Sequence, residues 1–197
     1  MKRFILILCM LICGSVFFAN DVNFVLGFQS DTMYGKDTES AVESILFSND
    51  ISVQAGLFGY VDRVGFGTLI DGGISIFALG LHQGGFKAYP LNYGLSAVIE
   101  LKKKEKHRIN VSLCTRKIVV HKAKNTNDKE IELDMKFSFP KVKLEYLYLF
   151  EKLKYCTGGF VFGVNYAIVS GFEKDSEKYG FEHLNPVGFN FGCRYYF

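Results

Sequence analysis

PVGFNFGCRYYF, residues 186–197, alternates between two kinds of side chain. One parity is apolar or aromatic and consists of Val187, Phe189, Phe191, Cys193, Tyr195 and Phe197. The other parity is mostly small or polar and consists of Gly188, Asn190, Gly192, Arg194 and Tyr196. A period of two predicts a β-strand. An almost wholly aromatic or aliphatic face opposite a small, polar one is typical of a strand with lipid outside and a wet lumen inside.

This ending resembles the C-terminal assembly signal of bacterial outer-membrane β-barrel proteins. The resemblance rests on Asn190, Gly192, Tyr195 and the final residue, Phe197. It implies location in the outer membrane, contact with outer-membrane lipid and recognition by the barrel-assembly machinery.

The other end of the chain looks like a secretory signal peptide. Lys2 and Arg3 precede an apolar run over residues 4–12, and small residues follow. The run is too short to span a bilayer as a helix, which needs about 20 residues. No second helical membrane segment follows in the sequence, so we expect an exported chain that is secreted, periplasmic or in the outer membrane.

We therefore divide the sequence into a signal peptide, residues 1–19, and one barrel domain, residues 20–197. The cleavage site is not sharply defined and is expected between about Ser15 and Asn20, because bulky Phe17 stands two places before Ala19.

Composition narrows the class of protein. Without Lys2 and Arg3 the basic and acidic residues nearly cancel, so nucleic acid is not an expected partner. The chain has 20 Gly and 20 Phe, typical of aromatic strands joined by turns. Cys114, Cys156 and Cys193 are odd in number and widely spaced, which predicts neither a disulfide framework nor a metal site.

Eight stretches of the mature chain have strand periodicity. They lie near residues 22–29, 48–60, 64–81, 87–101, 109–120, 131–150, 159–168 and 186–197. In the fifth the apolar parity switches, which predicts a bulge near Thr115–Lys117. In the sixth it switches at Pro140, where a bulge would accommodate the missing N–H.

The connections between these stretches alternate in length. Those near 61–63, 102–106 and 151–154 are short, whereas residues 30–47 and 171–185 are long. Outer-membrane barrels have short periplasmic turns, longer extracellular loops and an even strand number. We predict an all-β, eight-stranded antiparallel transmembrane barrel with up-and-down order. The alternative is a secreted, lipocalin-like barrel with its aromatic face inside.

The interior of an eight-stranded barrel is filled by its own side chains, so a general porin is not expected. Near the periplasmic turns, Glu100 and Arg108 face each other across a hairpin, and Arg194 is expected at the same depth. Because buried charges must be paired, these three residues predict a plug of charges in the lumen.

The extracellular half of the lumen is predicted to be apolar. The inward residues there are Leu69, Phe77, Leu79 and Leu81. Such an interior indicates binding or passage of small hydrophobic solutes. If the register instead slips at Gly72 and Gly73, these side chains face lipid. The barrel would then be structural, or would display or adhere through the loops 30–47 and 171–185.

An enzymatic role has less support. Some small outer-membrane barrels are acyl hydrolases with a Ser and a His near the outer rim. His82, His121 and His183 fall near that rim, but none has a Ser two positions away. We expect no enzymatic activity and no cofactor.

The C-terminal pattern generates a prediction about assembly. Changing Phe197 to Asp, or deleting residues 195–197, removes the aromatic ending and should block membrane insertion while export continues. Fractionation and heat-modifiable gel migration measure both steps. Normal folded levels in the outer membrane would contradict the assembly role.

Overall fold

The computed structural model describes residues 21–34, 50–75, 88–101, 106–120, 123–124, 130–131, 135–152, 154–168 and 187–197. The strands within these residues are β1 (Asp21–Tyr34), β2 (Asp50–Val61), β3 (Val64–Ser75), β4 (Ala88–Glu100), β5 (His107–Val120), β6 (Ala123–Lys124), β7 (Glu130–Ile131), β8 (Met135–Lys152), β9 (Thr157–Ala167) and β10 (Val187–Tyr196). The expected signal peptide lies outside the described residues and stays a prediction.

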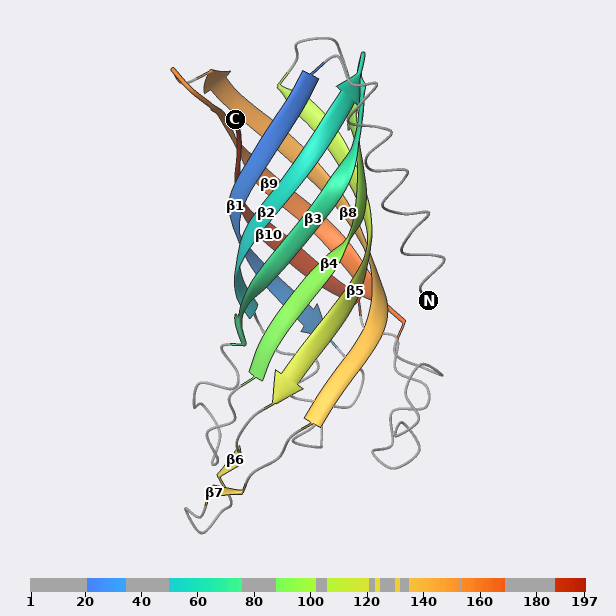
Figure 1. Ribbon diagram of the computed structural model, residues 1–197, viewed down its shortest axis with the longest axis vertical. Coiled ribbons are helices and arrows are strands. Elements are labelled where there is room, and N and C mark those ends of the chain that lie inside the picture. The colour runs from blue at the N-terminus through green and yellow to red at the C-terminus, as the bar shows by residue number, and fades with distance from the viewer. Residues whose placement is uncertain are drawn as a thin grey trace.

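Eight of the described strands close into an antiparallel barrel, in the order β1-β10-β9-β8-β5-β4-β3-β2 (Figure 1). The two remaining strands, β6 and β7, pair with each other in a small separate sheet. Within the described part of the chain, no helix is long and apolar enough to cross a membrane. The predicted eight-stranded barrel is confirmed.

The terminal segment closes the barrel by pairing with the first strand. The ladder runs from Val25 opposite Tyr196 to Tyr34 opposite Val187. Beyond it, Phe24 and Phe197 exchange two backbone hydrogen bonds of 3.2 and 2.9 Å. Closure pairs the edges that an open sheet would leave exposed.

The two ends of the barrel differ. Asp62 and Arg63 join β2 to β3 in a tight turn in which Asp62 has a left-handed φ of 53°. The Leu101 N–H donates to the His107 carbonyl at 3.1 Å and closes the turn between β4 and β5. We call this end, which also holds Phe197, the turn end. The loop end is the opposite one, where β1, β3, β5 and β9 finish.

The outer face of the barrel is apolar and the inner face is polar. On β10, Phe191 is 61% exposed, whereas Asn190 and Arg194 are 3% and 0% exposed. The apolar parities of the other barrel strands are exposed in the same way, including Phe28, Leu113 and Phe162. A lipocalin-like barrel would have the opposite arrangement, so that alternative is wrong. An exposed apolar band around a closed barrel is a surface for lipid.

The bulge expected near Thr115–Lys117 is absent. The ladder between β5 and β8 is continuous from His107 opposite Tyr148 to Val120 opposite Met135. Ile118 is buried on the same side of β5 as Arg116. The apolar parity therefore switches because an apolar side chain enters the lumen near the loop end, and the strand itself stays regular.

Pro140 also lies in an unbroken part of this ladder, opposite Thr115. Its carbonyl accepts a hydrogen bond of 2.9 Å from the Ile168 N–H. In an antiparallel ladder the N–H and C=O of one residue point to the same neighbour. The side of Pro140 that lacks an N–H therefore faces the segment just beyond Ala167, the last residue of β9. No hydrogen bond within the β8–β9 ladder is lost there, so no bulge is required. The irregularity in β8 lies between Leu149 and Lys152.

The register of β3 does not slip at its two central glycines. Gly72 and Gly73 pair with Val53 and Ser52, and the ladder with β2 continues to Ser75. Within the described residues, the odd positions of β3 stay on the inner face, including Leu69 and Asp71, which are buried.

The lipid-facing surface generates a prediction about stability. Leu144 lies in the middle of the apolar parity of β8, whereas Val187 begins β10 at the loop end. We expect Leu144→Arg to lower the free energy of unfolding by about 2–4 kcal/mol and Val187→Arg by about 0–1 kcal/mol. Urea unfolding in lipid vesicles measures both. Equal losses would mean that the two positions do not differ in membrane depth.

Candidate functional site in the barrel lumen

An apolar layer fills the lumen toward the turn end. Its buried members are Val25, Phe58, Tyr60, Leu69, Val98, Leu147, Leu149, Val161 and Tyr196. They come from β1, β2, β3, β4, β8, β9 and β10, so the layer extends around the barrel. Side chains packed in this way exclude water from this part of the lumen.

An ion pair lies between this layer and the rim at the turn end. Glu100 and Arg108 are directly opposite each other, and Arg108 Nη2 is 2.5 Å from Glu100 Oε1. Both side chains are 15% exposed. The Arg108 guanidinium also lies 5.3 Å from the ring centre of Tyr60 and 4.9 Å from that of Tyr196. The expected contact between Glu100 and Arg108 is therefore present, and aromatic rings enclose it.

Arg194 does not join this pair, so the expected three-residue group is wrong in that respect. Arg194 Nη2 lies 2.8 Å from Glu145 Oε2, and Arg194 Nε donates to Gln54 Oε1 at 3.1 Å. Glu145 also accepts hydrogen bonds from Asn110 at 2.6 Å and from Asn190 at 2.8 Å. We call these five residues the central cluster.

Gly163 provides the space for the central cluster. It lies on β9 between Glu145 of β8 and Asn190 of β10, and it pairs with both. A Cβ at this position would lie 2.6 Å from Asn190 Oδ1 and 2.9 Å from Glu145 Cγ. Any larger residue would therefore displace the side chains that bind each other across the strand.

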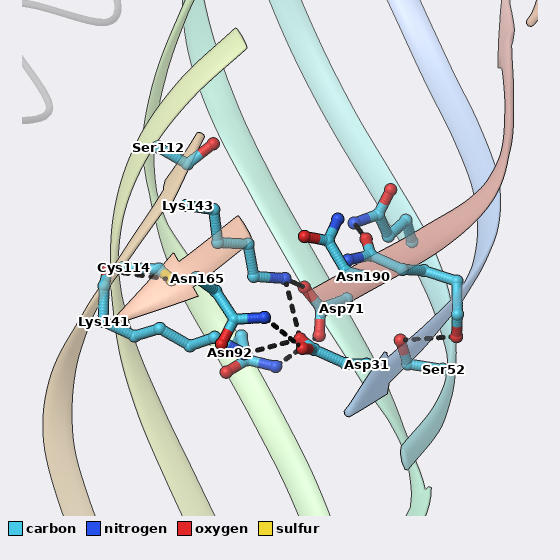
Figure 2. Close-up of polar contacts among 12 residues, drawn as sticks. Asp31, Ser52, Asp71, Asn92, Ser112, Cys114, Lys141, Lys143, Asn165 and Asn190 are labelled. Carbon is cyan, nitrogen blue, oxygen red and sulfur yellow. Dashed lines mark hydrogen bonds and ion pairs between the residues drawn. The ribbon is translucent and has the colours of Figure 1, made fainter. Parts of the chain in front are cut away.

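A second group, the loop-end cluster, surrounds Asp31 nearer the loop end (Figure 2). Lys141 Nζ lies 2.5 Å from Asp31 Oδ2, and Asn165 donates to Asp31 Oδ1 at 2.6 Å. Lys143 Nζ lies 2.9 Å from Asp71 Oδ2 and 3.5 Å from Asp31 Oδ2. Asn92 completes the group by donating to Asp71 Oδ1 at 2.5 Å.

The buried charges balance. A further ion pair joins Arg116 Nη2 to Asp50 Oδ2 at 2.6 Å, and both side chains are buried. Among the inward residues of the described strands, the acids that are at most 4% exposed are Asp31, Asp50, Asp71 and Glu145. The bases in the same class are Arg116, Lys141, Lys143 and Arg194. Equal numbers of each sign reduce the cost of keeping these charges out of water.

The contacts of the loop-end cluster cross the lumen. Lys141 and Lys143 project from β8, whereas Asp31 and Asp71 come from β1 and β3. In barrel order β8 is separated from β1 by β9 and β10, and from β3 by β5 and β4. Side chains from such distant strands meet only inside the barrel. The lumen is therefore occupied by paired side chains at this level.

The described lumen is arranged differently from the expected one. Its apolar layer lies at the turn end, and charged side chains lie toward the loop end. Leu69 faces inward as expected, but it borders a cavity with room for about one water molecule that is also lined by Asp71, Asn92 and Lys143. Phe77, Leu79 and Leu81 lie outside the described residues, so an apolar zone formed by them stays a prediction.

The residues of the expected assembly signal lie on β10 and directly after it, and their role in assembly stays a prediction. Of the assembly-signal residues, Asn190 binds Glu145, Tyr195 is exposed on the outer face and Phe197 closes the barrel against Phe24.

Cys114, Cys156 and Cys193 are free thiols. No group of three or more metal-ligating side chains occurs in the part of the chain that the structure describes.

The fold and the occupied lumen define the class: a small, eight-stranded transmembrane β-barrel. The chain is similar in structure to Neisserial surface protein A, with a TM-score of 0.52 and 8% identity over 89% of this chain and 98% of that one. It is also similar to the N-terminal β-barrel domain of OprF from Pseudomonas aeruginosa, with a TM-score of 0.54 and 10% identity over 89% and 97%. No family model and no curated protein matches this sequence. These likenesses show the fold of small outer-membrane barrels.

The central cluster generates a prediction about stability. Arg194→Gln leaves the buried Glu145 carboxylate without its cation and should lower the free energy of unfolding by about 3–5 kcal/mol. Combining it with Glu145→Gln removes both charges and should cost less. Urea unfolding in lipid vesicles compares the two variants.

Arg108→Gln is the matched control, because its ion pair with Glu100 is partly exposed. We expect a smaller loss than for Arg194→Gln. If the single and double variants at Arg194 and Glu145 lose equal stability, the two residues do not stabilise each other.

Proposed function

We propose that this protein is an integral outer-membrane β-barrel that does not conduct ions and that acts by presenting its loop-end connections at the cell surface. The observation that carries the proposal is the pairing of lysine and aspartate side chains across the lumen. Lys141 and Lys143 meet Asp31 and Asp71 there, so a hydrated ion would have to break those pairs to pass. A barrel without an open lumen acts through its ends or its outer face.

The orientation follows from the connections. The turn end, with Asp62, Arg63 and the C-terminus, faces the periplasm in this proposal, and the loop end faces outward. The longest connections, which include residues 35–47 and 171–185, are then displayed to the exterior. Loops on a rigid scaffold are common binding surfaces. One of the proteins with a similar fold is named a surface protein.

Passage of hydrophobic solutes has less support. It rests on Leu69, Phe77, Leu79 and Leu81, of which only Leu69 lies in the described lumen, beside the charged Asp71. We also propose no enzymatic role, because the buried acids and bases of the lumen bind each other and thereby have structural roles.

Surface display predicts which connections are reachable from outside. An epitope inserted within residues 171–185 should be labelled by antibody on intact cells, whereas one inserted within residues 102–105 should be labelled only after the outer membrane is permeabilised. Heat-modifiable migration of each tagged protein is the control for folding.

Labelling of the 102–105 tag on intact cells would show that the turn end faces outward, opposite to the proposed orientation. Occlusion is tested separately in planar bilayers, where the purified protein should show little or no steady current. Steady ion current from folded protein would show that the lumen is open and would contradict the proposal.

A further inference from the structure

Lys117 is a cation on the outer face of the barrel. It is exposed on β5, and two neighbouring outward residues, Leu113 on the same strand and Leu91 on β4, are also exposed. The other lysine and arginine side chains described within barrel strands face the lumen. A lysine at a lipid-facing position is costly unless its ammonium reaches polar partners.

Lys117 lies at the loop-end edge of the apolar band. It follows His107, the first residue of β5, by ten positions. At about 3.3 Å per residue and a strand tilt of about 40°, this distance corresponds to about 25 Å along the membrane normal. The apolar band of a transmembrane barrel is about 25 Å tall. The ammonium of Lys117 is therefore at the depth of the lipid headgroups in the leaflet at the loop end.

Residues that carry hydroxyl groups are the neighbours of Lys117 on the outer face of the barrel. Its Nζ lies 5.4 Å from the ring centre of Tyr93, which restrains the side chain against the barrel wall. Ser138 is directly opposite Lys117 on β8, and Thr115 stands two positions before it on the same face of β5. An ammonium beside several hydroxyls offers charge and hydrogen-bond donors to a phosphate.

We propose that Lys117, with Thr115, Ser138 and Tyr93, binds the phosphate of a membrane lipid in the leaflet at the loop end. Leu91, directly opposite Lys117 on β4, and Leu113, four positions toward mid-membrane, form an apolar wall that contacts the acyl chains of the same lipid. Because free phosphate has no acyl chain to contact this wall, the site favours a lipid phosphate over free phosphate. The proposal rests on the membrane placement given above.

The test uses two lipids that differ only in the phosphate. Full-length folded protein in detergent micelles is mixed with dioleoyl phosphatidic acid or with dioleoylglycerol, and bound lipid is counted by native mass spectrometry. We expect phosphatidic acid to be retained and dioleoylglycerol to be lost. Lys117→Gln should weaken phosphatidic acid binding about fivefold, as expected for one lysine at a membrane surface, and Lys117→Arg should retain most of it.

Lys154 provides a matched control at the turn end. It is also exposed, and its Nζ lies 4.9 Å from the ring centre of Tyr155. Lys154→Gln should leave phosphatidic acid binding unchanged. Equal loss from both variants would show general attraction to surface charge and would overturn the site.

Two further outcomes would also overturn the site: equal retention of the two lipids by the wild-type protein, or ready displacement of phosphatidic acid by inorganic phosphate. Heat-modifiable migration is measured on the same samples. Folded protein without phosphate preference refutes only this inference, whereas protein that never folds in detergent or lipid refutes the membrane barrel itself.

Discussion

The carboxylate of Asp31, held by Lys141, Lys143 and Asn165, is the contact on which the loop-end half of the lumen depends. Its partners come from β8 and β9, and Lys141 is 110 residues away in sequence. Such a contact forms only when the first and last strands have paired. A buried carboxylate is costly until these cations reach it, so closure of the barrel and neutralisation of its interior occur together.

The two faces of the barrel are stabilised by different interactions. On the outer face, aromatic and aliphatic side chains contact lipid, which is a more favourable environment for them than water. Inside, the buried acids of the loop-end and central clusters are matched by bases, and asparagines supply further hydrogen bonds, as Asn110 and Asn190 do to Glu145. Near the turn end the lumen changes to an apolar layer, with Phe58 and Leu147 fully buried. At the rim of the turn end, the Arg108 guanidinium contacts the rings of Tyr60 and Tyr196.

The strands and the pair of Glu100 and Arg108 could be predicted because they depend on local alternation and on one hairpin. Alternation also shows that Arg194 faces inward, but its partner depends on the stagger of the strands around the barrel. That stagger brings Arg194 to Glu145, two strands away, past Gly163. The expected bulges are absent because an apolar parity does not always face lipid. Phe139 and Ile118 show that the lumen also holds apolar side chains.

The ion pairs that cross the lumen also hold the strands of the barrel wall in position. The loop-end cluster ties β8 to β1 and to β3 through Asp31 and Asp71, so the barrel wall is held together by contacts inside the lumen. The described loop-end strands therefore keep their positions through contacts that do not involve the connections between them. A scaffold braced in this way lets its connecting segments vary without loss of the fold. On the outer wall, the continuous ladder between β5 and β8 keeps Lys117 beside Ser138.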